Sequence, residues 1–308
     1  MQSVNECYKI VKKDCLKFIN SQENKAHKFK SKERMIKLYL IPLCFWIIKN
    51  KNKNKSLFIG LSGGQGSGKT TISFIVTLIL RKYFKISVFK ISIDDFYKTR
   101  KDRLKLSKKV HPLLITRGVP GTHDINMVIN FFKKIRNRNF RGIKLPKFNK
   151  AIDDRTPKSN WYSLKKRPEI IIFEGWCVGA RPQKEYQLKK SLNKLEKVDD
   201  HNLKWRKYVN YQLSTKYKQV FKYLDYLVYL NAKKFKLLEQ WRLKQENKLR
   251  LYSKNKKNLK VMSNSEVIKF MQTYQRITQN MFNDAPNYAS IVLDLNSNHQ
   301  IKSVKFNK

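Results

Sequence analysis

Short apolar runs recur along the chain at wide intervals, and they predict β-strands. They lie at residues 57–61, 87–93, 169–173, 226–230 and 290–295. Long helical or irregular stretches separate these runs, so the connections must be crossovers and the sheet should be mainly parallel. We therefore predict an α/β fold in which helices flank a five-stranded sheet. Functional residues are expected at the carboxyl ends of the strands.

The first fifty residues carry apolar positions at a helical spacing instead, beginning with Val4, Tyr8 and Val11. A polar linker separates these residues from the first predicted strand. We interpret residues 1–55 as an N-terminal helical extension and residues 56–308 as the main domain.

Three further segments complete the predicted organisation. Residues 183–222 combine many charges with aromatic side chains, and we expect them to form a helical insertion. The lysine-rich residues 247–264 are expected to form a loop. The apolar stretch 38–48 is too short to span a bilayer and contains Pro42, so we interpret it as a buried helix that packs on the sheet.

The most specific motif follows the first predicted strand, where the chain reads Gly-Gly-Gln-Gly-Ser-Gly-Lys-Thr-Thr. This is the glycine-rich loop and helix start of a P-loop, which predicts a P-loop NTPase fold that binds ATP and Mg²⁺. The loop N–H groups cradle phosphates, Lys69 should reach the β- and γ-phosphates, and Thr70 should ligate Mg²⁺. The predicted nucleotide-binding residues of this motif are Gly63, Gly64, Gln65, Gly66, Ser67, Gly68, Lys69, Thr70 and Thr71.

Acidic residues end two of the predicted strands. Asp94 and Asp95 follow the second strand, where a carboxylate would face the γ-phosphate and could accept a hydroxyl proton. Glu174 ends the third strand and could help hold Mg²⁺, as a Walker-B acid does. The alternatives are a turn or cap for the two aspartates and a solvated strand end for Glu174.

Arginines lie on the helix predicted after the fourth strand. Arg242 could close over the nucleotide and neutralise phosphate charge, with Arg250 a weaker candidate. Either could equally be a surface arginine.

Composition adds a large positive charge to this picture. The formal net charge is +46, from 68 Lys and Arg against 22 Asp and Glu. Such an excess can indicate nucleic-acid binding. Here the lysines are spread along almost every predicted element without a recognisable nucleic-acid-reading motif, so no specific nucleic-acid partner is expected. The charge would still attract anionic substrates.

The cysteines and the N-terminus bear on the compartment. Cys7, Cys15, Cys44 and Cys177 show neither a CxxC pair nor a metal-site spacing, which fits reduced thiols. The N-terminus has charges throughout and no apolar signal-peptide block. We therefore expect a cytoplasmic protein without a membrane role.

With these residues in place, the chain resembles the P-loop kinases related to uridine kinase, phosphoribulokinase and pantothenate kinase, and most of all the D-glycerate 3-kinase family. The most specific strings are Arg-Gly-Val-Pro-Gly-Thr-His-Asp at 117–124 and Glu-Gly-Trp-Cys-Val-Gly-Ala-Arg-Pro at 174–182. The resemblance implies ATP-dependent phosphorylation of a small hydroxy acid, with D-glycerate giving 3-phosphoglycerate. The alternatives are a pantothenate or uridine type of kinase, or a nucleic-acid-associated P-loop NTPase.

The resemblance also implies residue roles. It makes Asp94 the base, with Asp95 second, and it puts the acceptor substrate near the 117–124 string. The substrate-site candidates are Asp95, Tyr97, Arg117, His123, Asp124, Arg155 and Arg181. Arginine suits a carboxylate substrate because it pairs in a bidentate way. Each arginine could instead make a structural ion pair, and His123 could be a packed, hydrogen-bonded residue. Relatives usually carry Asp where Asn149 stands.

Overall fold

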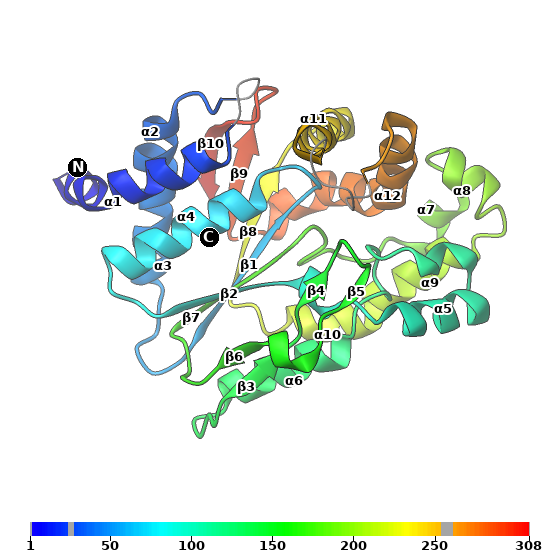
Figure 1. Cartoon of the computed structure of the whole chain (residues 1–308), viewed down its shortest axis with the longest axis horizontal. Coiled ribbons are helices and arrows are strands. Elements are labelled where there is room, and N and C mark those ends of the chain that lie inside the picture. The colour runs from blue at the N-terminus through cyan, green and yellow to red at the C-terminus, as the bar shows by residue number, and fades with distance from the viewer. Residues whose placement is uncertain (1, 24–27, 254–260, 308) are drawn as a thin grey trace.

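The chain builds a central sheet between two layers of helices (Figure 1). The computed structural model describes residues 2–23, 28–253 and 261–307. Within them six strands pair in the order β10-β9-β8-β1-β7-β2, and all but β10 run parallel. The strands are β1 (Leu57–Gly63), β2 (Val88–Ser92), β7 (Ile170–Gly175), β8 (Tyr226–Asn231), β9 (Ile291–Leu295) and β10 (Ile301–Phe306). The predicted α/β fold with a mainly parallel sheet is confirmed.

The predicted number of five strands is wrong, because the sequence analysis missed β10. This strand pairs antiparallel with β9 at the edge of the sheet. Its side chains Lys302, Ser303 and Lys305 are exposed, and Ile301 alone is buried. Exposed lysines are typical of edge strands, where they discourage pairing with another chain. Such a strand lacks the continuous apolar run that identified the other five.

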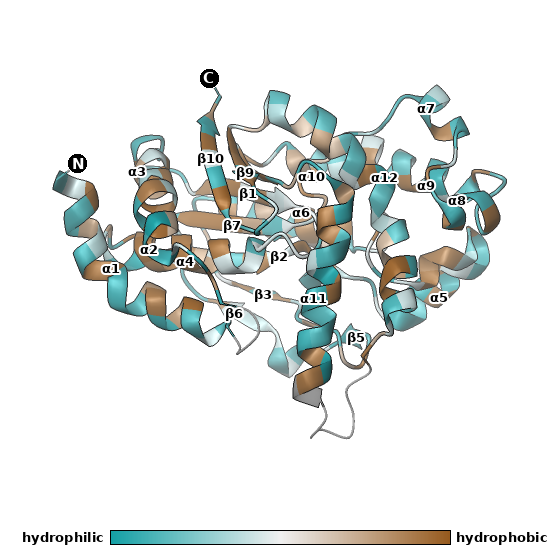
Figure 2. Ribbon diagram, turned by 90° about the horizontal axis from the view of Figure 1, so that it is seen from above, coloured by the Kyte–Doolittle hydropathy of each residue, from teal (hydrophilic) through white to brown (hydrophobic). Residues whose placement is uncertain are grey.

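Helices from the N-terminal region cover one face of the sheet. They are α1 (Gln2–Ser21), α2 (Lys32–Met35), the π-helical turn η1 (Ile36–Leu40), α3 (Ile41–Lys49) and α4 (Lys69–Lys82). Cys15 on α1 and Cys44 on α3 are fully buried in the same hydrophobic cluster as Ile75 of α4 and Ile59 of β1. Figure 2 shows β7 in brown and brown and teal stretches side by side on α1, α3 and α4, whereas α11 is mostly teal. No helix in the described part of the chain is long and apolar enough to cross a membrane.

The opposite face carries helices from later in the chain. They are α6 (Ile125–Arg136), α9 (Lys204–Gln212), η5 (Leu213–Tyr217), α10 (Lys218–Phe221) and α12 (Asn264–Tyr288). Phe131 and Phe132 of α6 pack with Phe173 of β7 in a second buried cluster. Residues 247–253, expected to lie in a loop, instead continue α11 (Phe235–Ser253). The rest of that expected loop up to residue 260 lies outside the described residues.

Smaller elements form the connection between β2 and β7. They are η2 (Ile93–Phe96), α5 (Arg100–Lys109), η3 (Pro112–Ile115), η4 (Lys158–Asn160), and the strand pairs β3 (Ile143–Leu145) with β6 (Tyr162–Leu164) and β4 (Phe148–Asn149) with β5 (Asp154–Arg155). The sheet register sets Glu174 of β7 opposite Leu61 of β1 on one side and Ser92 of β2 on the other. The P-loop, η2 and Glu174 therefore meet at one end of the sheet.

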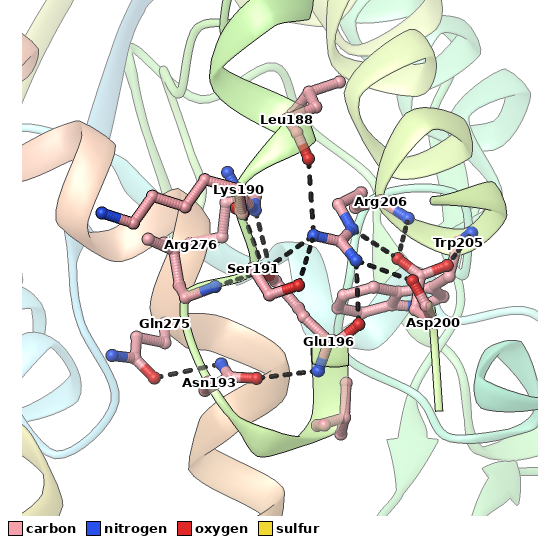
Figure 3. Close-up of polar contacts among 12 residues, drawn as sticks. Leu188, Lys190, Ser191, Asn193, Glu196, Asp200, Trp205, Arg206, Gln275 and Arg276 are labelled. Atoms are coloured by element: carbon pink, nitrogen blue, oxygen red, sulfur yellow. Dashed lines mark hydrogen bonds and ion pairs between the residues drawn. The ribbon is translucent and has the colours of Figure 1, made fainter. Parts of the chain in front are cut away.

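A buried ionic network fastens residues 183–222 to α12 (Figure 3). This segment is helical, with α7 (Glu185–Lys189) and α8 (Lys194–Val198) before α9. The Arg276 guanidinium of α12 donates two 2.7 Å hydrogen bonds to the two carboxylate oxygens of Glu196. Arg206 of α9 donates to Asp200 at 2.7 Å and to the carbonyl of Glu196 at 2.8 Å. Neither Glu196 nor Asp200 has any solvent exposure.

The substitution Glu196→Gln is expected to destabilise the fold by about 3–5 kcal/mol, because it leaves buried guanidinium charge without its carboxylate. Urea unfolding followed by circular dichroism measures this loss. The exposed pair of Glu185 with Lys207 supplies the control, since Glu185→Gln should change the unfolding free energy by less than about 1 kcal/mol. Equal effects of the two substitutions would mean that the buried network contributes no more than a surface pair.

Candidate active site

The P-loop spans the turn between β1 and α4. Gly66 and Gly68 have φ angles of +78° and +90°, a backbone conformation that side chains with a Cβ rarely adopt. The Lys69 Nζ donates to the carbonyls of Gly63 at 2.6 Å and Gly64 at 2.8 Å. Burial lowers the pKa of Lys69 to about 8, although the negative charges of Glu174 and Asp94 act to raise it. The loop joins β1 to α4, and its lysine is held against the backbone of the loop itself.

Helix α11 and the β9–β10 connection cover the outer side of the P-loop. Leu238 of α11 lies so near Gly64 that an added Cβ would come within 2.2 Å of its Cδ1 atom. Trp241 of α11 stacks on His299 of the connection, with ring centroids 4.2 Å apart. The side chains of Ser67, His299 and Gln300 each bury a polar atom that has no protein partner in the described residues. These aromatic and polar groups form a wall beside the phosphate-binding loop.

A cleft of about 990 Å³ opens beside the P-loop. Lys69, Thr70, Asp94, Asp95 and Glu174 line it, and so do Trp241 and His299. Residues of the N-terminal region also line it, among them Lys28, Phe29 and Lys30. Predicted residues from the P-loop and from two strand ends therefore share one cavity.

Glu174 lies next to the start of α4 and is almost fully buried. Its Oε1 atom is 3.5 Å from the Thr70 hydroxyl, and its Oε2 accepts a hydrogen bond of 3.0 Å from Ser73. In the described residues no three His, Cys, Asp or Glu side chains cluster as a metal cage. Mg²⁺ needs no such cage, because it is held by one or two carboxylates together with phosphates and water. The oxygen donors of Thr70 and Glu174 fit that requirement.

Asp94 lies in η2, at the end of β2. Its Oδ1 accepts a hydrogen bond of 2.9 Å from the hydroxyl of Tyr97, and its Oδ2 accepts one of 2.7 Å from the Lys150 ammonium. Burial by itself would raise the pKa of Asp94. The charge and the hydrogen bond of Lys150, with a smaller contribution from the Tyr97 hydroxyl, outweigh burial and lower this pKa. Asp94 is therefore an ionised carboxylate that lines the cleft.

Asp95 makes different contacts. Its two carboxylate oxygens each accept a long, 3.4 Å hydrogen bond, from the backbone N–H of Ser92 and of Phe148. It thereby closes the capping box of η2 and fastens the β4–β5 hairpin to that turn. Burial raises the pKa of Asp95 to about 6. Of the two adjacent aspartates, Asp94 is the more strongly ionised.

Tyr97 and His123 are buried behind Asp94. Their rings stack with centroids 4.4 Å apart, and His123 Nδ1 lies 2.6 Å from the Tyr217 hydroxyl. Burial lowers the pKa of His123 to about 3, so the imidazole is neutral. Neither residue lines the cleft. In this structure they support Asp94 through the Tyr97 hydroxyl.

Three of the predicted substrate-site residues form ion pairs around the β4–β5 hairpin. Arg117 pairs with Asp153 in the hairpin turn. Arg155 of β5 pairs with Asp124 at 3.2 Å and donates to the carbonyl of Tyr97 at 2.7 Å. These contacts match the structural alternative that the sequence left open for the arginines.

The two remaining predicted arginines lie away from the cleft lining. Arg181 sits 3.7 Å above the Tyr288 ring and lines a small separate cavity with Arg206 and Arg276. Arg242 pairs with Glu246 at 2.6 Å, one turn further along α11. The departure at Asn149 is accommodated locally, because its Oδ1 accepts the N–H of Ala151 at 2.9 Å and closes the hairpin turn.

Sequence reasoning missed several residues that line or support the cleft. Lys150 directly follows Asn149, yet it gave no signal of its own in so lysine-rich a chain. Trp241 and His299 come together only through tertiary packing. Ser73 lies one helical turn after Thr70, so a helical projection of α4 would have placed both hydroxyls on one face.

Comparisons with known proteins identify clear relatives, although no family model matches the chain. An uncharacterized kinase of Schizosaccharomyces pombe, mug58, is 32% identical over 73% of this chain and 80% of that protein. The chloroplastic D-glycerate 3-kinase of Arabidopsis thaliana is 30% identical over 77% of this chain, which spans about half (52%) of that protein's length. The structure of a D-glycerate 3-kinase from Cryptococcus neoformans superposes with a TM-score of 0.70, covering 87% of this chain and 96% of that one at 22% identity.

Proposed function

Because the chain belongs to the D-glycerate 3-kinase family of P-loop kinases, we propose that it transfers the γ-phosphoryl group of ATP to the carbon 3 hydroxyl of D-glycerate. The protein is an ATP-dependent kinase for a small molecule. The observation that carries the proposal is the shared cleft, in which the P-loop lysine Lys69 and the ionised Asp94 line one cavity.

The P-loop end of the cleft suits the nucleotide. The loop N–H groups and Lys69 bind the phosphates, and the positive end of the α4 dipole adds to their attraction. The nucleoside end of ATP lies toward Trp241 and His299, where an aromatic stack and unpartnered polar atoms offer a surface for a heteroaromatic base. Arg242 remains a predicted contact that would require α11 to move.

Thr70 and Glu174 hold Mg²⁺ in this proposal, with Ser73 fixing the Glu174 carboxylate. Mg²⁺ bound there neutralises part of the charge on the β- and γ-phosphates. Most of the catalysis in such a reaction comes from positioning and charge stabilisation, so the rigidity of these buried side chains matters.

Asp94 is the proposed base for the acceptor hydroxyl. Its carboxylate is ionised, lines the cleft and is fixed on one side by Tyr97. A hydroxy acid reaching Asp94 enters a basic region, because the lysines Lys28, Lys30, Lys69, Lys150, Lys244 and Lys248 all line the cleft. That surplus of cations favours an anionic acceptor over a neutral nucleoside.

An acceptor panel tests the proposed substrate. ADP release is measured with ATP and Mg²⁺ in the presence of D-glycerate, L-glycerate, pantothenate, uridine, ribulose 5-phosphate, DNA or RNA. We expect D-glycerate to stimulate turnover at least about tenfold over the acceptor-free rate, and L-glycerate to stimulate it far less. Stimulation by pantothenate or uridine alone would keep the kinase mechanism and replace the substrate, and stimulation by DNA or RNA would favour a nucleic-acid-associated NTPase.

A further inference from the structure

We infer that Lys150 is a catalytic residue of the phosphoryl transfer, whose ammonium group pairs with Asp94 and binds the γ-phosphoryl group as it passes to the acceptor oxygen. The inference rests on the proposed kinase function but not on the identity of the acceptor. Its first support is the ion pair of 2.7 Å between Lys150 Nζ and Asp94 Oδ2, in the lining of the cleft.

Two arginines anchor the hairpin that carries Lys150, in addition to the pairing of its two short strands. Arg103 is fully buried and donates to the carbonyl of Asp153 at 2.6 Å, with an ion pair to its carboxylate at 3.0 Å. Arg117 pairs with the same carboxylate and also donates to the carbonyl of Lys150 at 3.5 Å. Buried charges are costly unless they are paired, so these contacts hold the hairpin in one place. The backbone position from which the Lys150 side chain extends is thereby fixed.

The two partners of Asp94 differ in their freedom to move. Tyr97 is buried and stacked on His123, so its hydrogen bond to Oδ1 is fixed. The Lys150 side chain is 62% exposed, against 20% for Asp94. An exposed lysine on a flexible stem can leave one anion for another nearby. Oδ2 is therefore the oxygen that becomes available to an acceptor hydroxyl.

A cation near Asp94 Oδ2 would stabilise the negative charge of the phosphoryl group during transfer. The acceptor oxygen attacks the γ-phosphorus, the bond from that phosphorus to the bridging oxygen breaks, and ADP leaves with the electron pair. The acceptor proton passes to Asp94 Oδ2. A hydroxyl held by Oδ2 lies within a few ångströms of Lys150, and so do the oxygens of the phosphoryl group whose phosphorus it attacks. Lys69 approaches them from the P-loop and Lys150 from the hairpin.

Lys150→Met tests the inference against two matched variants. Lys150→Arg keeps the charge, and Lys147→Met removes a lysine of the same segment whose side chain lies over the Tyr162 ring instead. We expect Lys150→Met to lower kcat about 10–100-fold with the KM for ATP changed less than about threefold, Lys150→Arg to retain most of the rate, and Lys147→Met to match the wild type. A kcat for Lys150→Met within about twofold of the wild type would overturn the inference.

The pH profile separates this role from a structural one. The groups that influence or flank Asp94 are Lys69, Asp95, Tyr97, His123, Lys150, Cys177 and Tyr274. Lys150 favours the ionised form of Asp94, so its removal raises the pKa of Asp94. The acidic limb of kcat/KM should then move to higher pH by about 1 pH unit in Lys150→Met. An unmoved limb would contradict the inference.

Rates are measured with whichever acceptor of the panel the wild-type enzyme phosphorylates. A wrong acceptor assignment therefore leaves the test of Lys150 intact. The carboxyl titration of Asp94, followed by NMR with carbon-13 aspartate and assigned with Asp94→Asn, gives a readout that needs no turnover. The same titration midpoint in Lys150→Met and the wild type would overturn the pairing on which the inference stands.

Discussion

Replacing Asp94 by asparagine is expected to lower kcat by about 10²–10⁴-fold while leaving ATP binding nearly intact. Asparagine has almost the same shape and can still accept the hydrogen bond from Tyr97, but it cannot take the proton of the acceptor hydroxyl. Asp94 lies outside the P-loop, so the phosphates of ATP keep their ligands. The measurements are steady-state turnover and calorimetric titration with ATP.

The matched control for this substitution is Asp199→Asn, an exposed aspartate of the helical segment after α8. It should leave both quantities unchanged. If Asp94→Asn loses ATP binding together with turnover, Asp94 belongs to the metal and nucleotide site and is not the base. If kcat falls less than about tenfold, proton removal by Asp94 contributes little to the barrier.

Replacing Lys69 by alanine should reduce kcat/KM by at least about 10²–10³-fold. Two effects add. The substitution removes the ammonium that neutralises the transferring phosphoryl group, and it removes the hydrogen bonds to the carbonyls of Gly63 and Gly64 that hold the loop. ATP affinity should fall as well, in contrast to Asp94→Asn. Steady-state turnover measures the loss of kcat/KM, and titration with ATP measures the loss of affinity.

An exposed lysine supplies the comparison for Lys69. Lys189→Ala, on α7, removes one positive charge from the same highly basic surface and should change turnover by less than about twofold. Equal losses of turnover in the two variants would mean that the effect comes from the overall positive charge of the protein. Substantial residual activity in Lys69→Ala would contradict a role for this lysine in binding phosphate.

The sheet could be predicted because its central strands are buried on both faces and therefore have continuous apolar runs. The P-loop and the acids at the carboxyl ends of β2 and β7 could be predicted to share one end of the sheet, because the carboxyl ends of parallel strands lie together. The edge strand β10 was not predicted because four of its six residues are exposed to solvent, which leaves no continuous apolar run.

The acceptor side of the site was harder to predict because it depends on which partner each charge meets. Arg117, Arg155 and Asp124 look like a set of substrate ligands in the sequence, yet in the fold they pair with Asp153 and with one another. Lys150 has no distinguishing neighbour in the sequence, and only the hairpin brings its ammonium group to Asp94. The N-terminal residues at the cleft gave no signal either, since they lie beyond every recognised motif.

The most direct test of the account is the position of the phosphoryl group in the product. Purified protein is incubated with ATP, Mg²⁺ and carbon-13-labelled D-glycerate, and the product is identified by phosphorus and carbon NMR. We expect stoichiometric ADP and 3-phosphoglycerate, with the phosphorus coupled to carbon 3. Inorganic phosphate with unchanged D-glycerate, or phosphate on carbon 2, would contradict it.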